Sequence, residues 1–545
     1  MRLWIPLGLI CCAGLAPAQS LTIDSGTIEG AHFGSSPDEI MFLGIPYATP
    51  PTGNLRWKPP QPVERWKGAR KANTFGAACP QPEYFNDKAY RRELAETFEP
   101  YYTYRTNEDC LYLNVWTTNL PANPGAEKFP VMFWIHGGGN ISGSSQAVPM
   151  GPALARKGVV LVSINYRLGA LGFLAHPALT AESPQHASGN YGILDQIAAL
   201  QWVRRNIANF GGDPTNVTIF GESAGGANVC YLMSSPLARG LFQRSILESN
   251  ACTDYIDPEL KNPSHYEGGV GTSEEIGMRL VRDLGIQDGP DALLKLRLKT
   301  PKEIMNVSDR DHAVNFSGTI DGWVLTEQPA TAFAQGRQSK VPVIAGSNAD
   351  EGTTMVEEDL GASPTLANYK AYLKNEFLEY AGEIFRIYPA ATDADARAAF
   401  IAFDTDYGFG FSVHRFATNM ASAGQKAWFY YFTYPGKKKY ADVGAFHGIE
   451  LKFLTGWVRP SRWGEPDAED NKLINVMTGY WTQFAKIGDP NGPGLPHWPV
   501  YDPKTDLAFE IGHEVKLRPT PHTDRFAVFE RSLTSRLALA GHESK

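Results

Sequence analysis

The chain has 545 residues, of which 43% are hydrophobic and 20% are charged, a composition typical of a folded globular protein. Its formal net charge is −8 at pH 7, and its basic runs, at residues 204–205 and 437–439, are short. Nucleic-acid binding depends on extended basic surfaces, so this charge pattern argues against nucleic acid as the main partner.

The first 18 residues have the pattern of a signal peptide. Arg2 supplies a positive charge, an apolar run follows from Leu3 to about Leu15, and small residues occupy positions 16–18 (APA). This run and every later one are shorter than the ~20 apolar residues of a membrane span, so we expect no stable membrane insertion. The sequence therefore predicts cleavage after Ala18, a secreted or periplasmic protein, and a single domain over residues 19–545.

Four cysteines remain after the predicted cleavage: Cys79, Cys110, Cys230 and Cys252. In an oxidising compartment, Cys79 and Cys110 could close a loop of about 30 residues. The state of Cys230 and Cys252 is less clear from the sequence. None of the four has the spacing of a metal site, and the chain contains no HExxH or CxxC motif, so we expect no metal and no cofactor.

Short apolar segments alternate with helical ones along the chain. Strands are predicted at residues 130–135, 158–164, 217–220, 245–247, 341–345 and 428–434. Helices are predicted at 191–210, from 224 onward and at 467–487, and the segments 273–334 and 365–423 have the composition of helical insertions. This alternation predicts an α/β protein with a mostly parallel sheet, helices on both faces and insertions over the carboxyl edge of the strands.

The segment VTIFGESAGG places a GxSxG motif between a predicted strand and a predicted helix. A nucleophilic serine requires this context, because the strained turn lifts its hydroxyl above the sheet edge and the glycines allow close backbone approach. GxSxG alone is weak evidence for a nucleophilic serine, whereas the same motif between a strand and a helix is strong evidence. The motif predicts Ser223 as a nucleophile.

A second glycine-rich motif, HGGG at residues 136–139, follows the predicted strand 130–135. Acyl transfer builds negative charge on the carbonyl oxygen, and backbone N–H groups of a glycine loop can stabilise that charge. We therefore expect an oxyanion hole formed by the N–H groups of Gly138 and Gly139, together with that of Ala224, the residue after the nucleophile.

A serine nucleophile needs a base, and the base needs a carboxylate that orients it. In this architecture the chain order is serine, acid, histidine. His447 lies in a glycine-flanked loop (AFHGIEL) after the strand at 428–434, and it is the predicted base. Asp350 and Glu351 follow the strand at 341–345, and their spacing alone does not choose between them as the acid.

Taken together, the motifs resemble the type-B carboxylesterase/lipase family of cholinesterase-like α/β-hydrolases. The segments that carry the resemblance occur in order over nearly the whole mature chain: FLGIPYATPPTGNLRWKPP, EDCLYLNVW, HGGG, SINYRLGALGFL, GNYGILDQIAALQWVRRNIANFGGDPTNVTIFGESAGG, ADEGT, FHGIEL and WTQFAKIGDPN. The resemblance implies the α/β-hydrolase fold and selects Glu351 as the acid.

The same resemblance implies several structural pairings. It implies a Cys79–Cys110 disulfide at the rim of the active-site gorge, and a serine at position 249 near the catalytic histidine. It also implies two ion pairs, Arg56 with Glu108 and Arg167 with Asp195.

The sequence departs from the family pattern at three points. Asn140 follows HGGG, where the family often has an aromatic residue. The second disulfide of the family has no clear counterpart, and because Cys230 lies in the helix after the nucleophile we expect it to be a buried thiol, with a bridge to Cys252 as the alternative. The Cys79–Cys110 loop contains tyrosines and a phenylalanine (residues 84, 85, 90, 101, 102 and 104) but no tryptophan, which disfavours choline esters.

The sequence thus predicts an enzyme that hydrolyses small carboxylic esters with water through a Ser–Glu–His triad. A lipase of the same family is an alternative, disfavoured because no long apolar lid is evident. A non-catalytic binding protein of the same fold is a further alternative, and the presence of the serine, both triad partners and HGGG argues against it. Motifs do not indicate which ester is the substrate.

Overall fold

The computed structural model describes residues 19–82, 105–121, 127–261, 271–287, 289–308, 318–361, 363–436, 443–457 and 464–541. The predicted signal peptide lies outside these residues, as do the aromatic residues predicted within the Cys79–Cys110 loop.

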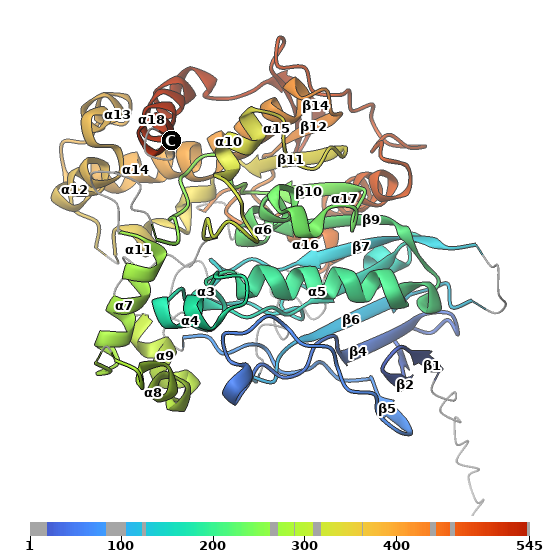
Figure 1. Ribbon diagram of the computed structural model, residues 1–545. Helices are drawn as coiled ribbons and strands as arrows, with labels where there is room; N and C mark the ends of the chain where they lie inside the picture. The colour runs from blue at the N-terminus through green and yellow to red at the C-terminus, as the bar shows by residue number, and fades with distance from the viewer. Residues whose placement is uncertain are drawn as a thin grey trace, which may run out of the picture.

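A single large sheet of eleven strands forms the centre of the molecule (Figure 1). In spatial order the strands are β14 (Val515–Pro519), β13 (Leu507–Ile511), β12 (Ala427–Phe432), β11 (Val343–Asn348), β10 (Arg244–Glu248), β9 (Gly212–Glu222), β7 (Phe129–Ile135), β8 (Val160–Ile164), β6 (Tyr112–Thr117), β4 (Ile40–Pro46) and β3 (Ala31–His32). Neighbours from β13 to β8 are parallel, and only the two flanks are antiparallel. The predicted mostly parallel sheet is confirmed. A small separate sheet contains β1 (Ser20–Ile23), β2 (Gly26–Glu29) and β5 (Ala69–Lys71).

The strands of the large sheet are apolar throughout because both faces are covered by helices. Along β7, Val131, Phe133 and Ile135 belong to the core on one face, whereas Met132 and Trp134 belong to the core on the other. The first core includes residues of α5 (Tyr191–Asn206), α6 (Ala224–Ser234) and α15 (Ser412–Ser422), and the second those of α2 (Gly151–Ala155), α16 (Leu451–Leu454) and α17 (Ala468–Ile487). Because successive side chains of a strand point to opposite faces of the sheet, β7 contributes side chains to two separate cores.

The two predicted helical insertions are present. The first contains α7 (Ser273–Asp283), α8 (Ala292–Leu298), α9 (Pro301–Ser308) and α10 (Pro329–Ala334). The second contains α11 (Val356–Asp359), α12 (Leu366–Phe377), α13 (Ala381–Ile387), α14 (Asp393–Asp404) and the π-helix η7 (Thr405–Phe411), which leads into α15. Short elements complete the chain: α3 (Gly169–Phe173), α4 (Pro177–Glu182), η1 (Gly53–Leu55), η3 (Ile207–Phe210), η4 (Pro236–Ala238), η5 (Glu351–Thr353) and η6 (Leu378–Tyr380).

Both insertions lie at the end of the sheet where the parallel strands finish. Helix α9 contacts α3, a short helix that follows β8, and α14 contacts η5, the turn that follows β11. Helices α12, α13 and α14 lie with the C-terminal helix α18 (Thr523–Gly541) at the upper left of Figure 1, and they pack around a third, aromatic-rich core. The predicted placement over the carboxyl edge is therefore confirmed.

Two ion pairs implied by the family resemblance are present and shielded from water. Arg56 Nη2 lies 2.6 Å from Glu108 Oε2, and Arg167 Nε lies 2.7 Å from Asp195 Oδ2. Arg167 also donates from its backbone to the same carboxylate, so Asp195 in the second turn of α5 is held by several donors. These pairs fix the segments that precede the site, and breaking such a buried pair costs about 3–5 kcal/mol.

The state of Cys230 differs from the expected buried thiol. Cys230, in α6, forms a disulfide with Cys252, which follows β10, and the Cα atoms are 5.6 Å apart. The prediction of a free thiol is wrong because β10 is the parallel neighbour of β9. The end of β10 is thereby brought under the helix that β9 feeds into.

Removing this second disulfide should destabilise the protein without abolishing its fold. The bridge closes a segment of 22 residues, for which chain entropy gives about 3 kcal/mol of stabilisation. We expect Cys230→Ser/Cys252→Ser to lower the free energy of unfolding by about that amount in a urea titration. An unchanged unfolding midpoint in non-reducing buffer would contradict this expectation.

Candidate active site

Ser223 occupies a sharp turn between β9 and α6. Its φ of 56° and ψ of −128° are unusual for a residue with a side chain, and such strain is typical of functional positions. The backbone N–H of Ser223 donates to Glu248 O at 2.8 Å, which anchors the turn to β10. Ser223 is partly exposed although Glu222 and Ala224 on either side are buried, as a nucleophile above a sheet edge requires.

The glycines of the motif permit this tight turn. A Cβ atom built on Gly221 would lie 2.5 Å from Gly225, and one built on Gly225 would lie 2.2 Å from Ile135 O. Any side chain at either position would push the helix away from β9 and β7. The GxSxG spacing is thus explained by close backbone contact.

The HGGG loop follows β7 and lies against this turn. Gly138 and Gly139 have φ values of 104° and 63°, and a Cβ on Gly138 would lie 2.3 Å from Ser142 O. The carbonyl of Gly138 accepts hydrogen bonds from Ile141 N and Ser142 N, which closes the loop into a turn. No described residue accepts a hydrogen bond from the N–H of Gly138 or Gly139, and the N–H of Ala224, at the first position of α6, has no acceptor within its helix. The three predicted oxyanion donors therefore remain available to a ligand.

His447 and Glu351 form a close pair. His447 Nδ1 lies 2.6 Å from Glu351 Oε2, and both side chains are fully buried. The other oxygen of Glu351 accepts the backbone N–H of Asn348 at 2.7 Å. Asp350 does not share this contact, because its Oδ2 accepts the backbone N–H of Ala445 instead. The structure therefore brings His447 together with Glu351 and leaves Asp350 outside the pair.

Three further carboxyl groups surround this pair, and sequence reasoning did not identify them. Glu222 Oε1 lies 3.2 Å from His447 Nε2, and Glu450 accepts a hydrogen bond from Asn348 Nδ2 at 2.5 Å. Glu248 accepts a hydrogen bond from Trp481 Nε1 at 3.1 Å. Glu222 and Glu450 lie inside quoted motifs, beside the nucleophile and three residues after the histidine. Their positions in these motifs were the sequence features that could have identified them as members of the site.

Burial prevents this cluster from carrying a full set of negative charges. Burial, together with the charges of Glu351 and Glu248, raises the pKa of Glu222 well above its usual value. Burial and the neighbouring carboxylates likewise raise the pKa of Glu450, and burial raises the pKa of Glu248 to about 8. Burial and like charges at short range therefore disfavour the ionised forms of these carboxyls.

The pKa of His447 has a consequence for the pH dependence of any reaction in which it is the base. Burial by itself lowers this pKa, but the charge and hydrogen bond of Glu351 outweigh burial and raise it above the usual 6.5. A protonated imidazole cannot accept a proton, so kcat/KM should fall as the pH drops through a midpoint above 6.5.

A pH–rate profile from pH 5 to 9 measures this midpoint. His414→Gln is a matched control, because His414 bonds to Asp506 instead, and it should leave the midpoint unchanged. A profile that is flat between pH 6 and 8 would be incompatible with His447 as the base.

The π-helix η7 supports the pair from one side. The ring of Phe409 packs against the ring of His447 with centroids 4.5 Å apart, and Thr405 Oγ1 accepts the backbone N–H of Gly352 beside Glu351. π-helical turns often occur at functional sites. Neither contact was predicted from the sequence. The contact with His447 depends on the ring of Phe409, which approaches from a distant insertion.

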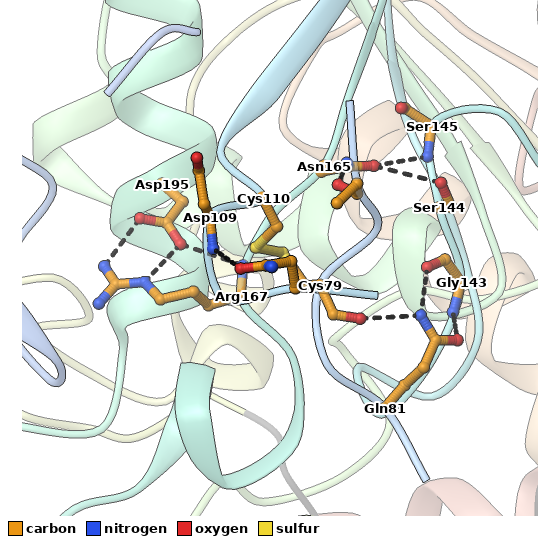
Figure 2. Close-up of a disulfide and its surroundings, with 12 residues drawn as sticks. Cys79, Gln81, Asp109, Cys110, Gly143, Ser144, Ser145, Asn165, Arg167 and Asp195 are labelled. Carbon is orange, nitrogen blue, oxygen red and sulfur yellow. Dashed lines mark hydrogen bonds and ion pairs between the residues drawn. A yellow bond between two sulfur atoms is a disulfide. The ribbon is translucent and has the colours of Figure 1, made fainter. Parts of the chain in front are cut away.

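The Cys79–Cys110 disulfide, present as the resemblance implies, lies between two polar contacts shown in Figure 2. On one side is the Arg167–Asp195 pair. On the other, Gln81 donates to Gly143 O at 3.1 Å and accepts from Gly143 N at 3.1 Å. Further along the same segment, Asn165 Oδ1 accepts a hydrogen bond of 2.8 Å from the backbone N–H of Ser145. The disulfide thereby joins the two ends of the predicted gorge loop, and the Gln81–Gly143 hydrogen bonds join the first of these ends to the segment after the HGGG loop.

Ser249, which the resemblance places near the histidine, follows β10 and is fully buried with a φ of 55°. Its hydroxyl has no hydrogen-bond partner among the described residues. Its backbone N–H donates to Gly346 O at 2.8 Å, so it lies at the carboxyl end of β10 and β11, beside the other site residues.

Comparison with known proteins assigns the family. The family model described as "Carboxylesterase family" matches residues 17–529. The chain is 38% identical to a fumonisin B1 esterase of Sphingopyxis macrogoltabida over 496 residues, covering 89% of this chain and 84% of the relative. It is 33% identical to the para-nitrobenzyl esterase of Bacillus subtilis (strain 168), covering 89% and 93%.

A solved thermophilic PNB esterase superposes with a TM-score of 0.78 at 30% identity, covering 94% of this chain and 100% of that one. This match confirms the α/β-hydrolase fold. The chain therefore belongs to the carboxylesterase family and is a serine carboxylesterase.

Proposed function

We propose that this enzyme hydrolyses carboxylic esters with Ser223 as nucleophile, His447 as base and Glu351 as the orienting acid. The observation that carries the proposal is the 2.6 Å contact between His447 Nδ1 and Glu351 Oε2, two fully buried side chains at the strand ends. A carboxylate that accepts the Nδ1 proton fixes the tautomer in which the lone pair of Nε2 can take a proton from the serine. The strained turn at Ser223 supports the same assignment.

In the acylation half, the hydroxyl oxygen of Ser223 attacks the ester carbonyl carbon while His447 Nε2 takes the hydroxyl proton. The carbonyl oxygen becomes negative and is stabilised by the N–H groups of Gly138, Gly139 and Ala224. Collapse of this intermediate breaks the bond to the alcohol, and the imidazolium gives its proton to the departing alkoxide. The acyl group remains on Ser223.

In the deacylation half, His447 removes a proton from water as the water attacks the acyl-enzyme carbonyl. The same oxyanion donors stabilise the second intermediate. Its collapse releases the carboxylic acid and returns the proton to Ser223. The cycle uses only ester and water, and the side chains described above supply every proton transfer.

We further propose that the mature protein begins at Gln19, forms a single domain and acts outside the cytoplasm. Two disulfides, Cys79–Cys110 and Cys230–Cys252, support an oxidising compartment. Within the described residues, no helix is both long and apolar enough to cross a membrane. Cell fractionation combined with N-terminal sequencing of the secreted form tests this proposal. Retention of residues 1–18 in the active form would contradict it.

The substrate class is best tested by a panel on the purified mature enzyme. Short-chain p-nitrophenyl esters, an emulsified long-chain triglyceride, a p-nitrobenzyl ester and fumonisin B1 form the panel, the last two because relatives are named for them. We expect turnover of soluble short-chain esters that disappears in Ser223→Ala. Activity on the emulsion alone would favour a lipase, and no turnover of any ester would favour a binding protein.

A further inference from the structure

The proposed oxyanion hole is assembled from two distant parts of the chain. Gly138 and Gly139 lie in the loop after β7, whereas Ala224 begins α6. A hole of this kind works only when its donors lie about 2.7–3.1 Å from a single oxygen. The separation between the loop and the helix must therefore be fixed within a fraction of an ångström.

One side-chain hydrogen bond joins these two parts directly. Asn140, the residue after Gly139, accepts at Oδ1 a hydrogen bond of 2.7 Å from Nδ2 of Asn228. Asn228 lies in α6, four residues and thus about one helical turn beyond Ala224. Asn140 is 5% exposed and Asn228 is fully buried, so water does not compete for this bond.

A buried tyrosine completes the link at the other end of the glycine run. The hydroxyl of Tyr166 donates to His136 O at 2.8 Å and lies 3.3 Å from both Asn140 Oδ1 and Asn228 Nδ2. Its ring stacks on His136 with centroids 4.5 Å apart. The residues that flank the three glycines are thus held by one network, and that network is anchored in α6.

The backbone at Asn140 explains why this residue type suits the position. Its φ of 57° is in the left-handed region, which asparagine tolerates far better than aromatic or β-branched residues. Its carbonyl accepts the N–H of Gly169 at 2.7 Å, so the loop is also tied to α3. Asparagine therefore satisfies the turn geometry and supplies the acceptor for Asn228.

We propose that Asn140 and Asn228 are positioning residues that set the distance between the two halves of the oxyanion hole. They act through the backbone N–H groups of Gly138, Gly139 and Ala224. This inference rests on the proposed function. It predicts that losing the pair weakens binding of the transition state while leaving binding of the ester almost unchanged.

The test uses Asn140→Gly, which keeps the left-handed backbone accessible, and Asn228→Ala. Each should lower kcat for a short-chain ester by about 10- to 100-fold with KM within about threefold, because a small misplacement of donors costs rate. Affinity for a trifluoromethyl ketone transition-state analogue should fall by the same factor as kcat/KM. The double variant should be no slower than the slower single variant, since both substitutions break one link.

Asn190→Ala is the matched control. Asn190 is also buried and joins two segments through Thr319, with hydrogen bonds of 2.7 Å and 2.9 Å, but it does not contact the HGGG loop. It should lower the melting temperature and leave kcat and analogue affinity unchanged. If Asn228→Ala does not fold, Asn140→Gly on the loop carries the test by itself.

Two results would overturn the inference: folded Asn140→Gly with wild-type kcat and analogue affinity, or losses that multiply in the double variant. Either result is distinct from failure of the proposed function. That failure would appear as a wild-type enzyme that turns over no ester, or as activity that survives in Ser223→Ala.

Discussion

Replacing His447 by alanine should lower kcat for a short-chain ester by about 10⁶-fold, an effect as large as loss of the nucleophile itself. The physical reason is that His447 is the proposed base that takes the proton of the Ser223 hydroxyl. Glu222 lies close to the imidazole, but burial and its charged neighbours raise its pKa, which disfavours the ionised form that could accept a proton. Steady-state kinetics with a chromogenic ester measures the loss.

The double variant Ser223→Ala/His447→Ala provides the control for this prediction. Residues that act as one unit give non-additive losses, so the double variant should be no slower than either single variant. A loss of only tenfold in His447→Ala would show that another group accepts the proton. Multiplied losses in the double variant would also contradict a joint role.

Replacing Glu351 by glutamine should lower kcat by about 10⁴-fold. The amide fits the same space but cannot stabilise the imidazolium, and it favours the wrong tautomer of His447. The adjacent Asp350→Asn is a matched control of equal charge change, because Asp350 faces Ala445 N and does not contact His447. It should keep kcat within a few-fold of wild type.

The comparison of the two variants decides which carboxylate is the acid. Equal losses in both would mean that general electrostatics, rather than one oriented carboxylate, supports the base. A larger loss in Asp350→Asn would reverse the assignment. Circular dichroism and thermal unfolding of each variant separate a catalytic loss from misfolding.

Much of the fold could be predicted from local patterns. The segments around β7, β8 and α5 were predicted nearly at their observed bounds, because buried strands and long helices leave strong periodic signals. The strand predicted at 217–220 is longer in the structure, at Gly212–Glu222. Its first half is polar and pairs with β7 only at Gly212, opposite Phe129, before the register shifts, and a local pattern does not report such irregular pairing.

The candidate site was predictable only where function requires a short, fixed spacing. GxSxG and HGGG are such spacings, so Ser223 and the glycine donors could be named from the sequence. The choice of Glu351 over Asp350 depended on the family resemblance, because both are carboxylates at the end of one strand. In the structure the distinction is one of direction: Glu351 points to His447 and Asp350 to Ala445.

The parts that could not be predicted depend on contacts between distant segments. Asn140 and Asn228 are separated by 88 residues, and although Asn140 was noted as a departure from the family pattern, its partner could not be named before β7 and α6 are brought together. The Cys230–Cys252 bridge was only the less favoured alternative for the same reason, since it depends on the neighbouring positions of β9 and β10. Phe409 reaches His447 from a helical insertion whose position a linear sequence does not specify.

The central claim is that Ser223 is the nucleophile of an acyl-enzyme mechanism, and covalent labelling tests it most directly. Incubation of the mature enzyme with diisopropyl fluorophosphate, followed by peptide mass mapping, should show one phosphoryl adduct on the Ser223 peptide with loss of activity. Ser249→Ala should be labelled like the wild type, and Ser223→Ala should not be labelled. An active wild-type enzyme that remains unlabelled, or an inactivating adduct on any other residue, would contradict the account.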